Sequence, residues 1–480
     1  MLINDRFYSS QFRIFSTHIV AEMDYLLKIS GRINIIYYET ITDIYRGYMS
    51  LQSEKVDDSW SFRDIDRSET SYLTHSYHRY PAKFIPQLAA RLIKENSQVE
   101  ELVCDPFMGS GTTLVESIVN DRRTYGTDIN PVAVMITKAK TTPLDPQYLE
   151  TQIYTLKGRI KRLLIDGDKR TLSLSNNDDI KAVFSSENKR IDYWFSEKQK
   201  HDLDIILSEI LIFSEDENVR NFLLCAFSNI LKGCSRWMMK SVKPTIDKNK
   251  TTNDAYKSFL LYTQQMSKKN RQFWKIYKKN KKKIDCMVDN VDARKMRIND
   301  DSVALIITSP PYVTSYEYAD LHQLTAIWLK YTEKLSEFRT KFIGSLQKKE
   351  LTDIRLYSDL GKTIVNELYL IDKREANGVE QYFFDMQKCF EEMYRVLKFG
   401  GRTAIVIGDT DIKKVKIQNA DVFVQTLEKI GFNIYNIIKR PIPNKILPLT
   451  RDQRTGQFVS TLKSDRLAYP FEYILIMEKA

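Results

Sequence analysis

The 480-residue chain has few of the residues that build disulfide frameworks or metal sites. Its five cysteines are scattered and never form a Cys-x-x-Cys pair, and of its five histidines only His75 and His78 lie close together. This distribution predicts a reducing compartment, no disulfide framework, and neither a structural zinc nor another metal site.

Long apolar runs are also missing. No stretch approaches the roughly 18 consecutive apolar residues that a membrane-spanning helix needs. Charged residues such as Asp5, Arg6 and Arg13 interrupt the start of the chain, which excludes the core of a signal peptide. The sequence therefore predicts a cytoplasmic protein with no membrane partner.

Basic residues, by contrast, are in excess. The 73 Lys and Arg outnumber the 62 Asp and Glu, for a formal net charge of +11. An enzyme of small metabolites has no need for such an excess, whereas a protein that binds a polyanion does. The sequence thus favours nucleic acid as a partner.

The densest basic stretch is residues 267–283, "SKKNRQFWKIYKKNKKK". It holds nine Lys or Arg, with Phe273, Trp274 and Tyr277 between them. On a helix, the aromatic rings would pack against the body of the protein while the lysines face phosphate groups. A solvated helix face explains any single lysine equally well. Residues 236–250 form a second basic stretch.

Strand and helix patterns divide the chain into four parts. Residues 1–65 form an N-terminal extension, and residues 66–145 alternate helix, strand and glycine turn as a parallel βαβ unit does. Residues 146–283 are mostly helical, poor in glycine and rich in lysine. Residues 284–480 return to strands and turns. The pattern predicts one α/β domain interrupted by a helical insertion, which we expect to contribute to target recognition.

A glycine turn follows the first strong strand. "EELVCDPFMGSGTTLVESIV" reads as a strand ending at Asp105, a turn with Gly109 and Gly111, and a helix that begins at Thr112. Such a turn lets a ligand approach the backbone and offers it free N–H groups. The next strand, in "TYGTDINP", ends at Asp128, whose carboxylate suits two ribose hydroxyls.

Two features that this turn lacks limit the type of nucleotide that it could bind. No lysine follows its second glycine, as it would in a phosphate-binding loop, and the GxGxxG of dinucleotide sites is incomplete. An adenosyl ligand that carries an amino acid therefore fits better than ATP or NAD.

A second turn, after another apolar strand, lacks two backbone N–H donors. In "LIITSPPY" an apolar strand stops at Ser309, Pro310, Pro311 and Tyr312. The two prolines remove two backbone donors and fix two φ angles, so neither strand nor helix continues. A simple strand terminator is the alternative interpretation of this segment taken alone.

Together, "DPFMGSGTT", "GTDINP", "THSYHRYPAKFIPQLAARLI" and "SPPY" resemble the motifs of the S-adenosylmethionine-dependent DNA amino-methyltransferases. The resemblance spans about residues 71–145 and 285–480. It implies a Rossmann-like methyltransferase fold, in which a mostly parallel seven-stranded sheet has an antiparallel C-terminal strand, with the helical insertion added. Many bacterial relatives with SPPY place the catalytic block first, so their domain boundaries do not transfer to this chain.

The same resemblance implies which residues contact S-adenosylmethionine. They are His78, Tyr80, Pro81, Ala82, Lys83, Phe84, Asp105, Phe107, Gly109, Gly111, Thr112, Asp128, Ile129 and Asp292. Lys83 would lie near the carboxylate of the methionine, Asp128 would hold the ribose, and an acidic residue such as Asp292 would face the adenine amine.

The implied catalytic residues are Ser309, Pro310, Pro311 and Tyr312. If an oxygen of Ser309 and the Pro310 carbonyl accept the two hydrogens of an exocyclic amine, its nitrogen can pyramidalise and attack the methyl group. Tyr312 would stack on a base that has left the duplex. Tyr316 and Tyr318 are candidates for the base pocket or for the core of the next helix.

Serine in the first position is typical, in this family, of enzymes that act on N4 of cytosine, although chemistry on adenine N6 uses the same geometry. Double-stranded DNA and a cognate restriction endonuclease are the partners that the resemblance implies. An RNA amino-methyltransferase and an inactive binding module remain alternatives. The intact Asp105, Gly109, Asp128, Ser309 and Tyr312 disfavour the inactive module.

Overall fold

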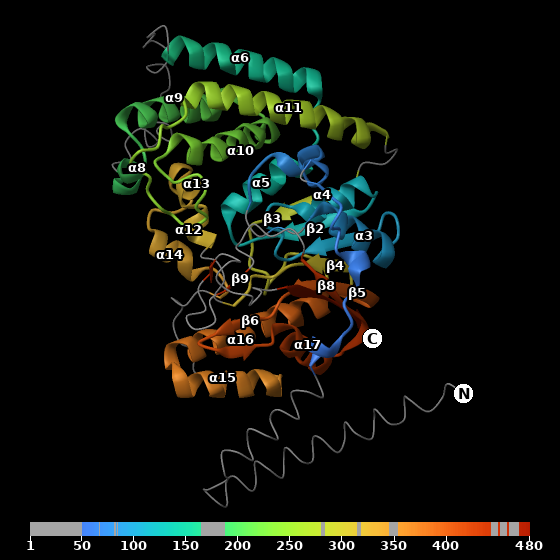
Figure 1. The fold of residues 1–480 in the computed structure, drawn as a ribbon. Coiled ribbons are helices and arrows are strands. Elements are labelled where there is room, and N and C mark those ends of the chain that lie inside the picture. Colours follow the sequence, from blue (N-terminus) through green and yellow to red (C-terminus); the bar gives the residue numbers. More distant parts are fainter. Residues whose placement is uncertain are drawn as a thin grey trace, which may run out of the picture. The chain divides into compact units, whose positions relative to one another are not determined.

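A seven-stranded β-sheet organises the computed structural model of the chain (Figure 1), with the strand order β3-β2-β1-β4-β5-β11-β8. Its strands are β1 (Leu102–Asp105), β2 (Arg123–Thr127), β3 (Cys286–Asp289), β4 (Val303–Thr308), β5 (Leu397–Ile407), β8 (Phe432–Pro441) and β11 (Phe471–Lys479). Strand β11 pairs antiparallel with both β5 and β8, and all other neighbours pair in parallel. The sheet confirms the predicted fold class.

The structure describes residues 50–66, 68–80, 83, 85–164, 188–279, 284–313, 318–344, 354–442, 450–451, 458–459 and 470–480. The chain divides into two units, Met1–Glu54 and Lys55–Ala480. The described part of the first unit contains one short helix, η1 (Leu51–Ser53). All other described elements belong to the second unit.

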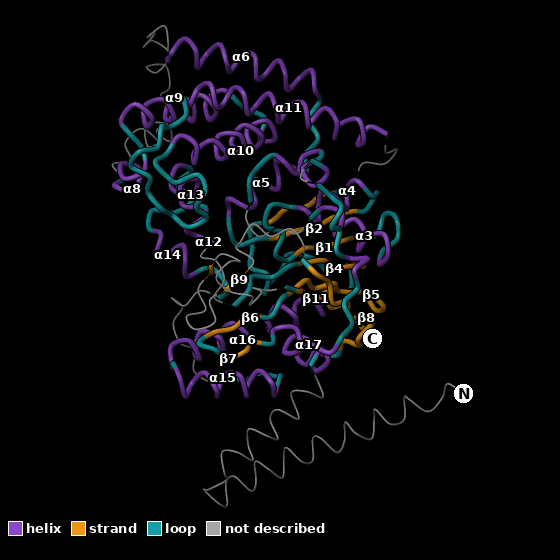
Figure 2. Tube along the Cα trace, in the orientation of Figure 1, coloured by secondary structure: helices purple, strands orange, loops and turns teal. Residues whose placement is uncertain are grey.

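Helices pack against both halves of the sheet (Figure 2). Helices α3 (Pro86–Asn96), α4 (Thr112–Val119) and α5 (Pro131–Thr141) accompany β1 to β4, while α16 (Lys373–Val396) and α17 (Asn419–Ile430) contact β5, β8 and β11. The remaining elements of these regions are η2 (Asp58–Trp60), η3 (Glu69–Ser71), η4 (Leu73–Ser76), α12 (Tyr318–Leu321), α13 (Gln323–Trp328), α14 (Leu335–Thr340), α15 (Asp359–Ile371), β6 (Thr410–Ile412), β7 (Val415–Ile417), β9 (Thr450–Arg451) and β10 (Phe458–Val459).

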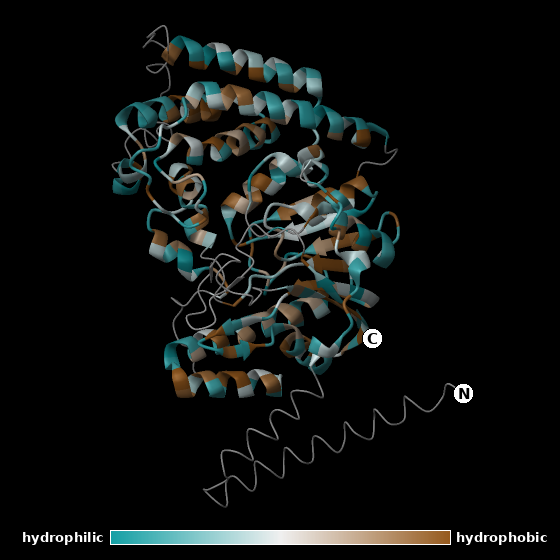
Figure 3. Ribbon diagram, in the orientation of Figure 1, coloured by the Kyte–Doolittle hydropathy of each residue, from teal (hydrophilic) through white to brown (hydrophobic). Residues whose placement is uncertain are grey.

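The core of the sheet follows the two-residue period of its strands. Leu305 and Ile307 of β4 join Ala404 and Val406 of β5 in one buried cluster that also contains Trp60. Every residue of β4 is buried, which explains why this strand reads as a continuous apolar run. Figure 3 shows the hydrophobic strands in the centre of the unit and hydrophilic residues along much of α6.

The described part of the insertion, which follows α5 and precedes β3, contains five helices. They are α6 (Pro146–Leu164), α8 (Lys189–Trp194), α9 (Glu197–Phe213), α10 (Glu217–Cys234) and α11 (Ala255–Lys279). Helix α10 packs on α5, and the insertion shares one apolar cluster with Val132 and Ile136 of α5. No helix of the described ranges has both the length and the apolar composition to cross a membrane.

Parallel pairing brings the carboxyl ends of three strands to one edge of the sheet. Asp105 at the end of β1 lies in register with Gly126 of β2, and β4 pairs with β1 through Val103 and Leu305. The residues that follow these strands therefore meet at the same edge, where ligands of open α/β sheets bind.

Candidate functional site

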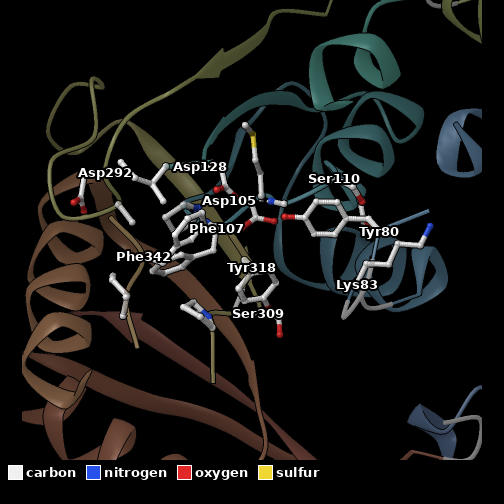
Figure 4. Close-up of a pocket in the computed structure, with 18 of the residues that line it drawn as sticks. Tyr80, Lys83, Asp105, Phe107, Ser110, Asp128, Asp292, Ser309, Tyr318 and Phe342 are labelled. Carbon is white, nitrogen blue, oxygen red and sulfur yellow. Dashed lines mark hydrogen bonds between the residues drawn. The ribbon is translucent and has the colours of Figure 1, made fainter. Parts of the chain in front are cut away.

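A pocket lies at this edge of the sheet (Figure 4). Its empty space amounts to about 870 Å³, counting open solvent at its mouth. Among the residues that line it are eleven predicted ones: Tyr80, Lys83, Asp105, Phe107, Gly109, Thr112, Asp128, Ile129, Asp292, Ser309 and Pro311. In Figure 4, Asp128 and Asp292 lie on one side, and Tyr80, Lys83 and Ser110 on the other.

Asp105 connects the glycine turn to the strand that precedes Ser309. One of its carboxylate oxygens accepts hydrogen bonds from Thr308 Oγ1 at 2.7 Å and Phe107 N at 3.1 Å, and the other accepts from Thr113 Oγ1 at 2.7 Å. Burial raises the pKa of Asp105 to about 6, although all three hydrogen bonds oppose that rise. Asp105 thus fixes the start of α4 and the end of β4 relative to each other.

Asp128 closes the glycine turn. Its carboxylate accepts hydrogen bonds from Gly109 N at 3.0 Å and Asn130 N at 2.8 Å. Burial raises the pKa of Asp128 to about 6, the two N–H groups lower it, and nearby Asp105 raises it further. An ionised carboxylate has about four lone-pair positions, so two remain for hydroxyl donors in the pocket.

The two glycines of the turn lie where a side chain would crowd its neighbours. Gly111 has a φ of +74°, and a Cβ on it would lie 2.6 Å from Thr137 Cγ2. A Cβ on Gly109, at a φ of +49°, would lie 3.2 Å from the ring of Tyr80. The turn therefore requires glycine for its backbone conformation and for close packing.

Asp292 lies in the loop after β3 rather than at the strand end. Its carboxylate accepts from Arg294 Nε at 2.9 Å and Arg294 Nη2 at 2.6 Å. Because Arg294 also contacts Asp385 of α16 with Nη1 at 2.5 Å, Asp292 is held in place at the pocket wall.

At the opposite end of the pocket, Tyr80 and Lys83 lie beside the glycine turn. The Tyr80 ring packs on His322 with a centroid distance of 4.7 Å, and His322 Nδ1 lies 2.7 Å from Asn130 Nδ2. Lys83 Nζ donates to the carbonyl of His75 at 3.0 Å. This end also presents the hydroxyls of Ser110 and Thr112, both buried and without a hydrogen-bond partner within the described residues.

The segment after β4 crosses the end of β5. Tyr382 of α16 donates its hydroxyl to the carbonyl of Pro311 at 2.9 Å. The ring of Tyr312 lies against Gly408, whose Cβ would be 3.5 Å from Tyr312 Cε2. The segment is thereby anchored at Pro311 and at Tyr312, while Ser309 and Pro311 line the pocket.

Some predicted residues are not brought to the pocket wall. Gly111, Pro310 and Tyr312 lie next to residues that line it, whereas His78 is buried, with Nε2 at 2.8 Å from Ser228 Oγ of α10. Pro81, Ala82, Phe84 and Tyr316 lie outside the described residues. Within the described ranges, no group of three or more His, Cys, Asp or Glu is arranged to hold a metal ion.

Eight other residues of the pocket wall belong to no motif that marked them as site residues in the sequence. They are Pro106, Met108, Ser110, Ala293, Tyr318, Lys341, Phe342 and Ile343. Tyr318 and Phe342 stack with a centroid distance of 6.5 Å and an interplanar angle of 20°. The spacing of aromatic residues after SPPY was the only signal for Tyr318, and nothing in the sequence marked residues 341–343.

Comparison with known proteins places these features in context. The family model described as DNA methylase, of the N6/N4 type, matches residues 20–139 and 303–480. The type II methyltransferase M.MvaI of Kocuria varians is 30% identical over 450 residues, which cover 88% of this chain and 96% of the relative. The type II methyltransferase M.BsoBI of Geobacillus stearothermophilus is 24% identical over 418 residues, 76% of this chain and 80% of the relative.

Among solved structures, an S-adenosylmethionine-dependent methyltransferase from Methanosarcina mazei aligns with this chain. The alignment covers 84% of this chain and 98% of the methyltransferase chain. The identity is 10% and the TM-score 0.27, at which the superposition supports no inference.

The glycine turn yields a first prediction. Gly111→Ala should destabilise the protein by about 2 kcal/mol or more, because alanine is strained in the left-handed region and its methyl group would collide with Thr137. Denaturant melts measure the loss. Gly158→Ala is the matched control: its Cβ would meet nothing within 4 Å in helix α6, so it should stabilise by up to about 1 kcal/mol. Equal stability of Gly111→Ala and the wild type would contradict the close packing of the turn.

Proposed function

The chain belongs to the DNA methylase family of type II N4/N6 amino-methyltransferases, which use S-adenosylmethionine; from this membership we propose that it methylates N4 of a cytosine flipped out of a DNA duplex. The observation that carries the proposal is that Ser309 lines the same pocket as Asp128 and Lys83. A methyl donor and an amine acceptor would therefore meet in one space. Adenine N6 is the alternative acceptor.

The pocket has complementary groups for the parts of the cofactor. The remaining lone pairs of Asp128 suit the ribose hydroxyls, and Asp292 and Ile129 suit the adenine. At the other end, Lys83 and the hydroxyls of Ser110 and Thr112, which have no hydrogen-bond partner among the described residues, suit a carboxylate. When bound, S-adenosylmethionine supplies a methyl group activated by its sulfonium.

The segment after β4 supplies the acceptors for the target amine. We assign them to an oxygen of Ser309 and the carbonyl of Pro310, which would engage both N–H groups and leave the nitrogen lone pair free to attack. The Asp105–Thr308 and Tyr382–Pro311 hydrogen bonds hold the segment on either side. Such fixed acceptors favour reaction by orientation, and the surplus proton of the methylated amine passes to solvent.

Aromatic rings near Ser309 would receive the base. Tyr318 and Phe342 form a stacked pair in the pocket wall, and Tyr312 lies next to it in the chain segment of Ser309. Stacking on aromatic side chains stabilises an extruded base by about 1 to 3 kcal/mol. We therefore propose that Tyr318 and Phe342 share with Tyr312 the role of stacking on the extruded base.

We further propose that the insertion binds the DNA duplex. One face of α11, with Met266, Asn270 and Phe273, is buried, and Asn270 holds both backbone groups of Leu144. Lys268, Lys275, Lys278 and Lys279 lie on the exposed side, where they can contact phosphates. In the second basic stretch, Lys250 is unsuited to this role because it donates to the carbonyls of Lys232, Ser235 and Trp237. A cognate restriction endonuclease is the proposed biological partner.

The product identifies the acceptor. Plasmid DNA treated with the protein and S-adenosylmethionine, digested to nucleosides and separated against standards, should contain N4-methylcytosine by mass spectrometry. The standards are needed because 5-methylcytosine has the same mass. N6-methyladenine instead would establish the alternative acceptor, and absence of any methylated base would overturn the proposed function.

Asp128 should make cofactor affinity depend on pH. Ribose hydroxyls donate to the ionised carboxylate, and its pKa of about 6 means that this form is lost as the pH falls through 6. The affinity for S-adenosylmethionine should therefore be constant above pH 7 and about tenfold weaker at pH 5. Calorimetry between pH 5 and 8 measures it.

Two variants separate this effect from other titrations. Asp128→Asn should weaken binding at pH 7.5 and abolish most of the pH dependence. Asp289→Asn, at the end of the neighbouring strand β3, removes a carboxylate that contacts Tyr125 outside the pocket, so it should bind like the wild type. An Asp128→Asn protein with unchanged affinity and pH profile would remove Asp128 from the cofactor site.

Ser309→Ala should slow methyl transfer at nearly unchanged cofactor affinity, because its oxygen is proposed to act on the amine in the transition state. We expect a single-turnover rate about ten- to a hundredfold lower. Ser302→Ala, just before the other end of β4, is the control, since its hydroxyl bonds Asn299 O away from the pocket. If Ser309 only ends the strand, its variant would melt earlier and keep its rate per folded molecule.

A further inference from the structure

His322 lies between two helices behind the pocket wall, in a position that no sequence motif marked. It separates α12 from α13, and its backbone N–H donates to the carbonyl of Tyr318 at 3.2 Å. Its side chain makes no capping hydrogen bond to α13. The ring is buried and turns instead to Asn130, whose Nδ2 lies 2.7 Å from His322 Nδ1. One residue thus contacts both Tyr318 and the turn that precedes α5.

The partners of Asn130 determine where this histidine carries its proton. Asn130 is the N-cap of α5, and its Oδ1 accepts from Val132 N at 3.0 Å, so the amide nitrogen is the atom that faces His322. Because that nitrogen can only donate, His322 Nδ1 must accept, and the proton of the neutral ring lies on Nε2. Burial lowers the pKa of His322 to about 4, which agrees with a neutral ring at physiological pH.

Asn130 extends this contact to the carboxylate that we propose holds the ribose. Its backbone N–H donates to Asp128 at 2.8 Å. Three hydrogen bonds in series therefore connect Tyr318, in the wall proposed to receive the base, with Asp128. The two residues between them, His322 and Asn130, are buried, so the loss of either side chain would leave a partner group without a bond.

Tyr80 of the pocket wall packs against the same two residues. Its ring lies on His322 with a centroid distance of 4.7 Å. Burial raises the pKa of Tyr80 well above its usual value, nearby Asp128 and Tyr318 raise it further, and a hydrogen bond with the Asn130 side chain lowers it. A phenyl ring at position 322 would also pack on Tyr80. The feature that histidine adds there is an acceptor for Asn130.

We propose that His322 is a positioning residue for methyl transfer: by accepting from Asn130, it fixes the side of the pocket that would hold the ribose relative to the side that would receive the base. The inference rests on the proposed function, with the ribose at Asp128 and the base beside Tyr318. Methyl transfer requires close alignment of donor and acceptor. Without the acceptor, Asn130 keeps a buried N–H group unpaired, which favours rearrangement of the turn between Asp128 and α5.

The test compares two replacements of His322. His322→Phe keeps a ring against Tyr80 and removes the acceptor, whereas His322→Asn removes the ring and offers an amide oxygen in place of Nδ1. His322→Phe should weaken S-adenosylmethionine binding about three- to tenfold, and slow single-turnover methylation at saturating cofactor by at least as much. His322→Asn should retain most of both. Calorimetry measures the affinity, and quenched reactions with plasmid DNA that the wild type methylates measure the rate.

Thr325→Val is the matched control within α13. Thr325 Oγ1 lies 2.7 Å from Ser228 Oγ of α10, so this variant loses a buried polar contact of the same helix that does not involve Asn130. It should melt at a lower temperature and bind the cofactor like the wild type. The inference fails if Thr325→Val weakens cofactor binding as much as His322→Phe does. It also fails if His322→Asn binds more weakly than His322→Phe, because the ring would then matter and the acceptor would not.

Asn130→Ser tests the same bond from its other partner. Serine keeps an N-cap oxygen for α5 and removes the donor to His322. If His322→Phe does not fold, Asn130→Ser should show the same losses, and unchanged affinity and rate would overturn the inference. A wild type that does not bind S-adenosylmethionine would refute the proposed function, whereas normal binding by the wild type and by both variants would refute the role of His322 alone.

Discussion

The carboxylate of Asp105 is the contact on which the rest of the site depends. It lies at the end of the central strand β1 and accepts hydrogen bonds from Thr113 at the start of α4 and from Thr308 at the end of β4. The glycine turn and the segment of Ser309 come from distant parts of the sequence. Their separation is set by two bonds of 2.7 Å to one side chain. Methyl transfer needs donor and acceptor aligned closely, so this carboxylate serves the chemistry without touching the reacting atoms.

The sequence was enough to predict the positions of site residues that depend only on where strands end. Asp105 ends a strand, Asp128 and Ser309 each directly follow one, and parallel strands end at one edge, so their convergence could be predicted. Phe342 could not, because its position depends on how separate helices pack, and the sequence left Tyr318 open between the base pocket and the core of its helix. His78 depends on such packing: its motif resembles a cofactor segment, and in the structure its ring contacts Ser228 of the insertion, outside the set of residues that line the pocket.

The insertion is joined to the site by polar contacts as well as by apolar packing. Ser228 of α10 contacts both His78, beside the cofactor segment, and Thr325 of α13, at 2.8 and 2.7 Å. Arg190 and Trp194 of α8 both donate to Gln323 at the start of α13. The insertion, which we propose binds DNA, is therefore joined through buried polar groups to the segment of His78 and to α13. A buried network of this kind is sensitive to the loss of any one partner.

The order of strands also has a consequence for how the protein is made. Strand β1 lies between β2, its neighbour in the sequence, and β4, which a ribosome synthesises only after the whole insertion. At about 5 to 20 residues per second, the open edge of β1 waits roughly ten to forty seconds for its partner. During that time Asp105 has no Thr308 to bind. The nascent chain can assemble the half that holds the glycine turn, but the methylating centre forms only after residue 308 leaves the ribosome.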